Sequence, residues 1–396
     1  MSDTDITAVL PDEKTCEQAR RSRDARFDGL FFTAVLSTRI YCRPVCPAPM
    51  ARRVEYFPSA AACEAAGYRP CLRCRPELSP ADGAWRRGDA VVARALKLID
   101  QGVLDEAPLA ELARRVDVGE RQLRRLFVDR LGVAPTGVHG TRRLLFAKQL
   151  LTETAMPITQ VALAAGFNSV RRFNDAFRDA YRMTPRDLRG KPVAATGQSL
   201  VLRLGYRPPY DFAAMLDFLR GRALPGVERV DEHGYARVIA PLQPGDAPGW
   251  LRVQAWPRAP GREPEHALRL ELHGAPPARM LEIVNRERRM FDLDADPRAI
   301  GDALGVDARL RPLVQQRPGL RVPSGWDGFE IAVRAIIGQQ ISVAGARGSV
   351  RSRPGRHRPA PAGSGTGAPA PAPAAWPAAG RSAAPAVRPA CARRRR

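Results

Sequence analysis

Apolar residues recur at helical spacing between about residues 85 and 190, and Gly and Pro fall between the runs rather than inside them. The clearest run is Val91, Val92, Ala95, Leu96, Leu98 and Ile99. Because this spacing places apolar side chains on one face of a helix, the segment 85–190 is predicted to be wholly helical.

Two helix–turn–helix units are predicted within this segment. In the first, a helix over 110–116 leads through a turn at Val118–Gly119 into a second helix. In the second unit the turn is at Gly166–Phe167, and a further helix over 141–151 separates the two units. Arg, Asn and Gln can bond bases in the major groove, and neighbouring arginines can hold phosphates. The outward polar residues predicted to contact DNA are Arg121, Gln122 and Arg125, then Ser169, Arg171, Arg172 and Asn174.

Residues 198–280 alternate apolar and polar positions over short stretches, a pattern typical of strands. Strands are predicted at about 200–204, 235–239, 250–256 and 267–272, around a helix entered at Asp211. From 281 to 347 the pattern returns to helical spacing. Asp327 is predicted to cap a helix that contains Phe329, Ile331, Val333, Ile336 and Ile337.

Residues 348–396 are mainly Pro, Ala, Gly and Arg and lack apolar periodicity. Such a composition cannot build a packed core, so this tail is predicted to be disordered. A basic tail that binds DNA phosphates is an alternative. The abrupt change of composition inside a domain also suggests a wrong-frame translation of GC-rich coding sequence, which re-reading the gene in the other frames would test.

Charge narrows the class of partner. The chain has 63 Lys and Arg against 41 Asp and Glu, a net charge of +22, which favours a polyanion such as nucleic acid over a neutral metabolite. A basic but otherwise ordinary surface is the alternative. The N-terminus has no signal pattern, and no run of about eighteen apolar residues occurs. We therefore expect a cytoplasmic, nucleoid-associated protein without a membrane partner.

Four of the seven cysteines form two close pairs. Cys42 and Cys46 stand in C-R-P-V-C, Cys71 and Cys74 stand in C-L-R-C, and 24 residues separate the pairs. Short loops bring two sulfurs to one ion, and the long spacer can fold back to supply the second pair. Four thiolates select Zn²⁺ over harder cations, so the sequence predicts a zinc site at these four positions.

The zinc site has two possible roles. In the first, the ion only holds a small domain together, as is common for a closed four-cysteine site. Hydrolysis is disfavoured because no open position remains for water. In the second role, an electron-rich thiolate attacks a methyl carbon. The other cysteines, Cys16, Cys63 and Cys391, lack such partners and are predicted to be ordinary thiols.

The residues around the cysteines carry a family resemblance. They read S-T-R-I-Y-C-R-P-V-C-P-A and Y-F-P-S-A-A-A-C-E-A-A-G-Y-R-P-C-L-R-C-R-P-E, and they closely resemble the Ada-type methyl phosphotriester repair domain of the bacterial adaptive response to alkylation. The resemblance implies that Cys42 accepts a methyl group from an alkylated DNA phosphate, irreversibly and once per molecule. Cys46, Cys71 and Cys74 are then the remaining zinc ligands.

Methylation of one thiolate would also change how the site meets DNA. Four thiolates and one Zn²⁺ carry a formal charge of two minus, and methylation removes one of these negative charges, so repulsion from phosphate falls. Arg39, Arg43, Arg52 and Arg53 add positive charge nearby. Arg43 adjoins the acceptor and is the predicted phosphate contact, whereas ordinary solvated arginines are the alternative.

Two further resemblances cover the rest of the chain. The G-F-N-S, F-N-D-A-F and M-T-P-R-D-L-R motifs resemble the AraC-type DNA-binding domain. The stretches L-R-L-G-Y-R-P-P-Y-D-F-A-A-M-L-D-F-L and M-F-D-L-D-A-D-P, and the run from R-P-G-L-R-V-P to A-I-I-G-Q-Q-I-S-V, resemble the AlkA-type 3-methyladenine DNA glycosylase. Such enzymes flip a base out of the duplex and cut its glycosidic bond.

The glycosylase resemblance stops at Ala346. The family next needs a glycine-rich hairpin and a catalytic Asp, and neither occurs in the tail. Asp292, Asp294 and Asp296 match a different family position and are predicted to cap helices or to be solvated. The P-C-H-R motif of the guanine-O6 alkyltransferase is absent as well. Base excision by this chain is therefore not expected.

Together these features predict a multidomain α+β protein. Its parts are a small zinc-bound α/β domain (12–80), an all-α double helix–turn–helix domain (85–190), a mixed α+β AlkA-type subdomain (198–280), an incomplete helical catalytic subdomain (281–347) and a disordered tail (348–396). The leading hypothesis is a monomeric, self-methylating DNA repair protein and transcriptional activator. Its partners would be alkylated and promoter DNA and, once it is methylated, RNA polymerase. A DNA-3-methyladenine glycosylase with accessory domains and a regulator with purely structural zinc are the alternatives.

Overall fold

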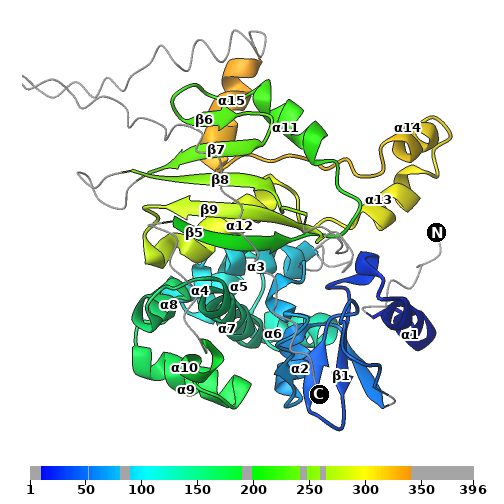
Figure 1. The fold of residues 1–396 in the computed structure, drawn as a ribbon, viewed down its shortest axis with the longest axis vertical. Coiled ribbons are helices and arrows are strands. Elements are labelled where there is room, and N and C mark those ends of the chain that lie inside the picture. The colour runs from blue at the N-terminus through cyan, green and yellow to red at the C-terminus, as the bar shows by residue number, and fades with distance from the viewer. Residues whose placement is uncertain are drawn as a thin grey trace, which may run out of the picture. The chain divides into compact units, whose positions relative to one another are not determined.

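A computed structural model describes residues 10–51, 53–80, 90–189, 199–240, 248–258 and 265–339, all within the unit Met1–Ser352. Helices and strands both occur, so the chain is a mixed α/β protein (Figure 1). The tail predicted at 348–396, residues 340–347 and Arg52 lie outside the described residues. No helix of the described part is both long and apolar enough to cross a membrane.

The cysteine-containing region is built on a small mixed sheet. Its elements are α1 (Glu13–Ser22), η1 (Ala25–Phe27), β1 (Phe32–Val35), β2 (Ile40–Cys42), β3 (Val54–Phe57), α2 (Ala60–Ala65), β4 (Arg69–Pro70) and η2 (Pro76–Leu78). The strand order is β3-β1-β2-β4, and β2 pairs with β4 in parallel. Tyr41 of β2 lies opposite Pro70 of β4, and the two strands are parallel. The next residues, Cys42 and Cys71, therefore lie side by side at the carboxyl ends of these strands.

The second region is helical, as predicted. It contains α3 (Ala90–Asp100), α4 (Val103–Glu106), α5 (Leu109–Arg115), α6 (Glu120–Leu131), α7 (Pro135–Glu153), α8 (Ile158–Ala164), α9 (Val170–Tyr181) and α10 (Pro185–Arg189). The pairs α5–α6 and α8–α9 are the two predicted helix–turn–helix units. The helix between them begins at Pro135 rather than at residue 141, because Pro is well suited to the first turn of a helix.

The third region contains a five-stranded antiparallel sheet. Its elements are β5 (Ser199–Gly205), α11 (Phe212–Arg220), β6 (Glu228–Val230), β7 (Gly234–Ile239), β8 (Gly249–Ala255) and β9 (Ala267–His273), in the strand order β5-β9-β8-β7-β6. The four predicted strands are confirmed. The strand β6 was not predicted, because three residues are too few to show alternation. Alternate residues such as Leu202, Leu251 and Leu270 are buried with Met215 of α11.

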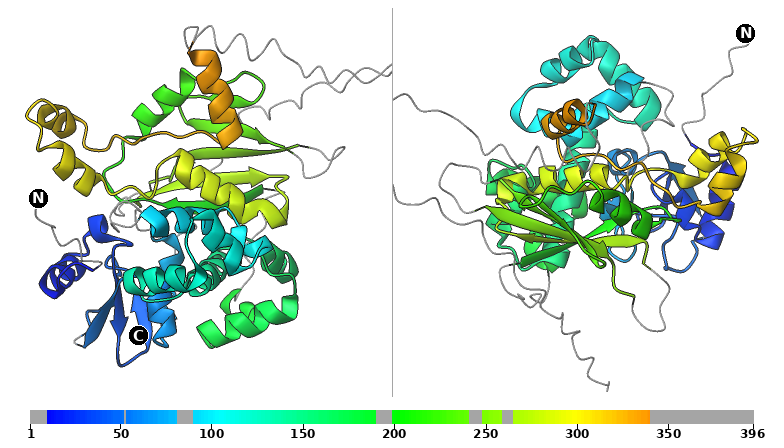
Figure 2. Two further views of the ribbon diagram at one scale, coloured as in Figure 1. Left: turned by 180° about the vertical axis from the view of Figure 1, so that it is seen from behind. Right: turned by 90° about the horizontal axis from the view of Figure 1, so that it is seen from above.

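Helices follow the sheet. They are η4 (Pro277–Arg279), α12 (Met280–Met290), α13 (Pro297–Leu304), α14 (Arg311–Gln316) and α15 (Gly328–Gly338). The helix α12 lies along the sheet (Figure 2) and contributes Met280 and Ile283 to the core. The predicted cap is confirmed, because the Asp327 carboxylate accepts a hydrogen bond from the Glu330 N–H at 2.8 Å.

Candidate metal centre

The structure brings Cys42, Cys46, Cys71 and Cys74 together at the end of β2 and β4. Their sulfur atoms all lie within 4.8 Å of one another. Backbone hydrogen bonds fix both loops: the Cys46 N–H donates to the Arg43 carbonyl at 3.1 Å, and the Cys71 N–H donates to the Tyr41 carbonyl at 2.9 Å. A tetrahedron with Zn–S bonds of about 2.3 Å has its sulfurs about 3.8 Å apart. The four positions therefore fit a single Zn²⁺ ion.

Backbone N–H groups distinguish one sulfur from the other three. The Arg43 N–H donates to Cys74 Sγ and the Arg73 N–H donates to Cys71 Sγ, both at 3.4 Å. The pKa of Cys46 is lowered to about 7, first by a hydrogen bond with Cys42 and further by the Ala48 backbone N–H. Among the described residues no backbone N–H donates to Cys42 Sγ.

Exposure makes the same distinction among the four ligands. Cys46, Cys71 and Cys74 are buried, whereas Cys42 is partly exposed. An N–H donor stabilises a thiolate and withdraws electron density from it. Cys42 is thus the most exposed residue of the four, and among the described residues no backbone N–H donates to its sulfur.

The Arg43 side chain does not face outward. Its guanidinium pairs with the Asp28 carboxylate, and its Nη1 donates to the Cys74 carbonyl at 3.0 Å. Burial disfavours the charged form, but Asp28 more than offsets this effect, so the pKa of Arg43 is raised. This placement differs from the predicted phosphate contact. The physical reason is that the C-R-P-V-C turn directs the side chain under the second cysteine loop, where a buried carboxylate receives it.

Another cation lies in the second cysteine loop. Arg73 is exposed between Cys71 and Cys74, and Leu72 beside it is 47% exposed. Arg53 and Arg39 are also exposed, and the Arg39 guanidinium lies over the Tyr68 ring, 5.1 Å from its centroid. The C-L-R-C spacing could have identified Arg73, because the two middle residues of a short metal loop point away from the ion.

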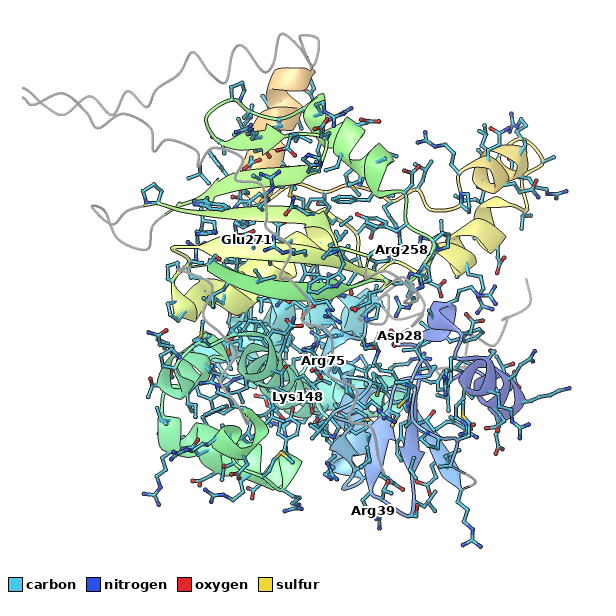
Figure 3. The ribbon with its side chains drawn as sticks, viewed as in Figure 1. Asp28, Arg39, Arg75, Lys148, Arg258 and Glu271 are labelled. Carbon is cyan, nitrogen blue, oxygen red and sulfur yellow. The ribbon has the colours of Figure 1, made fainter. Side chains whose placement is uncertain are left out.

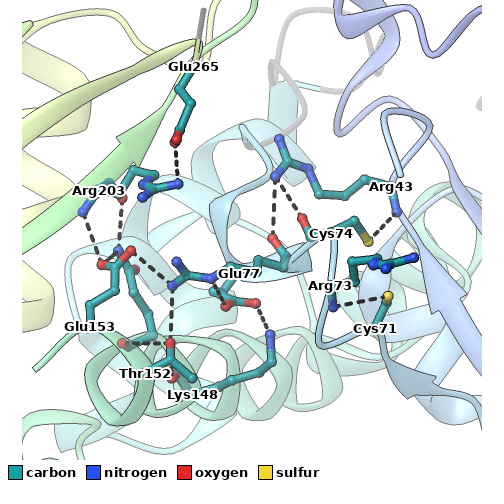
Figure 4. A network of polar contacts seen from close by, with 12 residues as sticks. Arg43, Cys71, Arg73, Cys74, Glu77, Lys148, Thr152, Glu153, Arg203 and Glu265 are labelled. Carbon is teal, nitrogen blue, oxygen red and sulfur yellow. Dashed lines mark hydrogen bonds and ion pairs between the residues drawn. The ribbon is translucent and has the colours of Figure 1, made fainter. Parts of the chain in front are cut away.

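A buried charge network adjoins the second cysteine pair. Lys148 of α7 pairs with Glu77, and each side chain is only 1% exposed. Arg75 Nε lies 3.1 Å from Glu77 Oε1, and Arg75 Nη2 lies 2.9 Å from Glu153 Oε1. Figure 4 labels Glu77, Lys148 and Glu153 of this network. Burial lowers the pKa of Lys148 and raises that of Glu153. Sequence patterns gave no sign of this network, which joins the loop after Cys74 to the helical region.

The predicted DNA-contacting residues lie on the second helix of each unit or at its start. Arg121, Gln122, Arg125, Arg171 and Arg172 are exposed, and Asn174 is partly exposed. Ser169 has a structural role that was not predicted: its hydroxyl oxygen caps α9 by accepting from the Arg172 N–H at 3.4 Å.

The three aspartates near α13 have local partners. Asp296 caps α13 through hydrogen bonds from the N–H groups of Arg298 and Ala299. Asp294 pairs with Arg288. Asp292 accepts from the Val322 N–H at 3.2 Å, and burial raises its pKa. The predicted capping role is confirmed for Asp296, whereas Asp292 and Asp294 are partnered rather than freely solvated.

Three family models match the chain in succession. They are the metal binding domain of Ada over residues 15–77, a helix-turn-helix domain over 112–191 and the AlkA N-terminal domain over 201–327. The first of these models and the four-cysteine cluster together identify the centre as a Zn²⁺ site.

Curated relatives match different lengths of this chain. The Probable bifunctional transcriptional activator/DNA repair enzyme AlkA of Mycobacterium tuberculosis is 39% identical over 343 residues, which are 85% of this chain and 67% of that protein. The Regulatory protein ada of Salmonella typhimurium is 30% identical over 267 residues, 66% of this chain and 67% of that protein. DNA-3-methyladenine glycosylase 2 of Escherichia coli is 38% identical over 141 residues, 36% of this chain and 45% of that enzyme.

Among solved structures, the methylated N-ADA/DNA complex is 33% identical over 34% of this chain and 98% of that chain, with a TM-score of 0.17. The sequence relatives and the three successive family models agree on one architecture. The chain belongs to the family of bifunctional transcriptional activator/DNA repair proteins that join an Ada-type metal-binding domain and a helix–turn–helix domain to AlkA-type sequence.

Proposed function

We propose that this protein repairs and senses DNA alkylation by transferring a methyl group from a DNA methyl phosphotriester to Cys42. The observation that carries the proposal is the difference among the four ligands. Cys42 is the partly exposed cysteine, and among the described residues its sulfur accepts no backbone N–H bond. A nucleophile must be both accessible and electron-rich, and Cys42 meets both requirements.

The transfer is a direct displacement. The Cys42 thiolate attacks the methyl carbon, the S–C bond forms as the C–O bond breaks, and the oxygen keeps the electron pair of the broken bond. The products are an S-methyl cysteine and an ordinary phosphodiester anion, and no proton is exchanged. When bound, Zn²⁺ keeps all four thiols deprotonated near neutral pH. A thioether is not readily demethylated, so each molecule reacts once.

Methylation then acts as the signal. The site loses one negative charge, and the backbone phosphates repel it less. Exposed cations such as Arg73 are positioned to gain from this change. We propose that tighter DNA binding lets α6 and α9 read a promoter, with Arg121, Gln122 and Arg125, and then Arg171, Arg172 and Asn174, as the contacts. The methylated protein is proposed to act as a cytoplasmic, nucleoid-associated monomer that contacts RNA polymerase.

Base excision is not part of the proposal. The AlkA-like part is proposed to comprise a sheet subdomain over 198–280 and an incomplete helical subdomain over 281–347, beside a zinc domain over 12–80 and a helix–turn–helix domain over 85–190. In the described residues Asp292, Asp294 and Asp296 all have local partners. None of the three is therefore free to stabilise a sugar cation.

Mass spectrometry of the intact chain, followed by peptide mapping, tests the proposal directly. The full chain is incubated with a duplex that carries methyl phosphotriesters, and the Cys42 peptide is expected to gain about 14 Da, the mass of one methyl group replacing hydrogen. Cys42→Ala should gain nothing. Cys16→Ala is the matched control, because that thiol is buried and is no ligand.

Three other results would contradict the proposal. Wild-type protein that gains no mass on Cys42 would exclude methyl transfer to this residue. Release of free methylated base would favour the glycosylase alternative. A Cys42→Ala protein that kept its zinc and its preference for damaged DNA would favour a purely structural metal.

A further inference from the structure

Arg207 lies completely buried in the segment after β5, with 0% of its surface exposed. Its Nε donates to the backbone carbonyl of Asp28 at 2.7 Å, and its Nη1 donates to the Asp294 carbonyl at 2.6 Å. Its Nη2 lies 3.5 Å from the Pro80 carbonyl. A buried cation is costly unless its donors are satisfied. Here one guanidinium joins two regions of the chain. It lies in the AlkA-like region, which follows residue 198, and it binds the loop that precedes β1 in the zinc-binding region, which ends near residue 80.

The loop at Asp28 is held in a single geometry. The Asp28 carboxylate is 3% exposed, pairs with Arg43 and accepts from the Ser79 hydroxyl at 3.0 Å. Gly29 follows at φ +77°, and a Cβ there would lie 2.0 Å from the Pro80 carbonyl and 3.0 Å from Arg207 Nη2. Only glycine fits so close to the guanidinium. Figure 3 labels Asp28, which lies between the zinc-binding region and the AlkA-like region.

Arg43 carries the connection from this loop to the cysteines. It follows Cys42 directly, its Nη1 donates to the Cys74 carbonyl at 3.0 Å, and its backbone N–H donates to Cys74 Sγ at 3.4 Å (Figure 4). One residue therefore bridges both cysteine pairs, and Asp28 orients its side chain. A shift of the Asp28 loop would move Arg43 and, with it, the acceptor sulfur.

We infer that Arg207 is a positioning residue for methyl acceptance, acting through Asp28 and Arg43, so that the AlkA-like region supports the acceptor site of the zinc-binding region. This inference rests on the proposed function. Without the guanidinium, the carbonyls of Asp28 and Asp294 lose a buried charged donor, so the Asp28 loop is expected to shift. A displacement of about 1 Å at a reacting atom can lower a rate by about 100-fold.

The test compares three variants of the full chain. Arg207→Met removes all the guanidinium donors. Arg207→Lys keeps the positive charge and a single donor group. Arg237→Met is the control. Arg237 is another buried arginine of the AlkA-like region, but its ion-pair partners are Glu228 and Glu330, within that region. Its loss should lower the melting temperature without disturbing the cysteine site.

Two readouts separate positioning from general stability. The first is the rate of mass gain on Cys42 at saturating methylated duplex. The second is the thiolate-to-metal absorption spectrum after Co²⁺ replaces the native ion. Arg207→Met is expected to lower the saturated rate about 10- to 100-fold and to shift the spectrum, at unchanged metal stoichiometry. Arg207→Lys should recover part of the rate, and Arg237→Met should match the wild type in both readouts.

Each outcome bears on the inference. A wild-type rate and spectrum in Arg207→Met would overturn it, and so would an equal loss of rate in Arg237→Met. If Arg207→Met does not fold, Arg207→Lys decides: a lowered saturated rate supports the inference, and an unchanged rate overturns it. If the wild type itself accepts no methyl group, the proposed function fails, while the Co²⁺ spectra still show whether Arg207 shapes the cysteine site.

Discussion

Glu287 is a buried carboxyl group without a hydrogen-bond partner. It lies in α12 with 0% of its surface exposed, and neither carboxyl oxygen has a partner among the described residues. Burial raises its pKa to about 8, although the charge of Arg237 lowers it and Glu228 raises it further. The side chain is therefore mainly neutral near pH 7. Because folding holds this proton, the stability of the AlkA-like region should fall as the pH rises from 4.5 to 8.

The magnitude follows from the two protonation states. The ordinary pKa of 4.5 applies to the unfolded chain and about 8 applies to the folded one. Because the folded state holds the proton more tightly, stability is highest below pH 4.5, falls as the pH rises from 4.5 to 8, and changes no further above that range. The difference between these two pKa values corresponds to about 5 kcal/mol in the free energy of unfolding. This is comparable with the whole stability of many domains, about 5–15 kcal/mol.

The assay is urea denaturation followed by tryptophan fluorescence between pH 5 and pH 9. Wild-type protein should lose several kcal/mol across this range, whereas Glu287→Gln should remove most of that slope. Glu287→Met should be the most stable form at pH 8.5, because no polar atom is then buried unpaired. Glu282→Gln is the matched control on the same helix. Its carboxylate pairs with arginines that outweigh the opposing effect of its burial and lower its pKa, so it should not alter the slope above pH 5. An unchanged slope in Glu287→Gln would show that Glu287 does not set the pH dependence.

Three further predictions concern the other regions. Lys148→Met should destabilise the protein by about 3 kcal/mol in urea denaturation. This loss is at the low end for a broken buried ion pair, because Arg75 still contacts Glu77. The double variant Lys148→Met with Glu77→Met should recover most of the lost stability. An equal loss in the double variant would contradict the pairing. Arg171→Ala and Arg121→Ala should each weaken promoter binding by about 1–3 kcal/mol. A salt titration then distinguishes the two kinds of contact. Loss of a base contact leaves the slope of log binding constant against log salt concentration unchanged, whereas loss of a phosphate contact lowers that slope by about 1. Removal of Zn²⁺ by a chelator should abolish hydrogen-exchange protection in β2 and β4 but leave the protection of the helical region. The reason is that β2 ends at the metal ligand Cys42 and β4 ends directly before the ligand Cys71, whereas the helices of the helical region end at neither.

The helices, the strands and the four metal ligands can be predicted from the amino-acid sequence alone. The spacing of Cys42, Cys46, Cys71 and Cys74 predicted one metal site, because two short loops constrain four sulfurs wherever the rest of the chain lies. The helix–turn–helix pairs and the cap at Asp327 were equally readable. These features depend on periodicity and on neighbours a few residues apart, so they are local properties of the chain.

Which polar residues are available to a ligand depends on how the chain folds. Arg43 adjoins Cys42 in the sequence, yet a carboxylate fifteen positions earlier takes up its guanidinium. Lys148 and Arg207 resemble any other basic residue in the sequence, yet the fold buries both and satisfies each with partners far away in the chain. Charge in a sequence does not reveal whether a side chain will be desolvated, because that depends on segments that meet only after folding. For the same reason, no spacing rule could have identified a buried arginine of the AlkA-like region as part of the surroundings of the cysteine cluster.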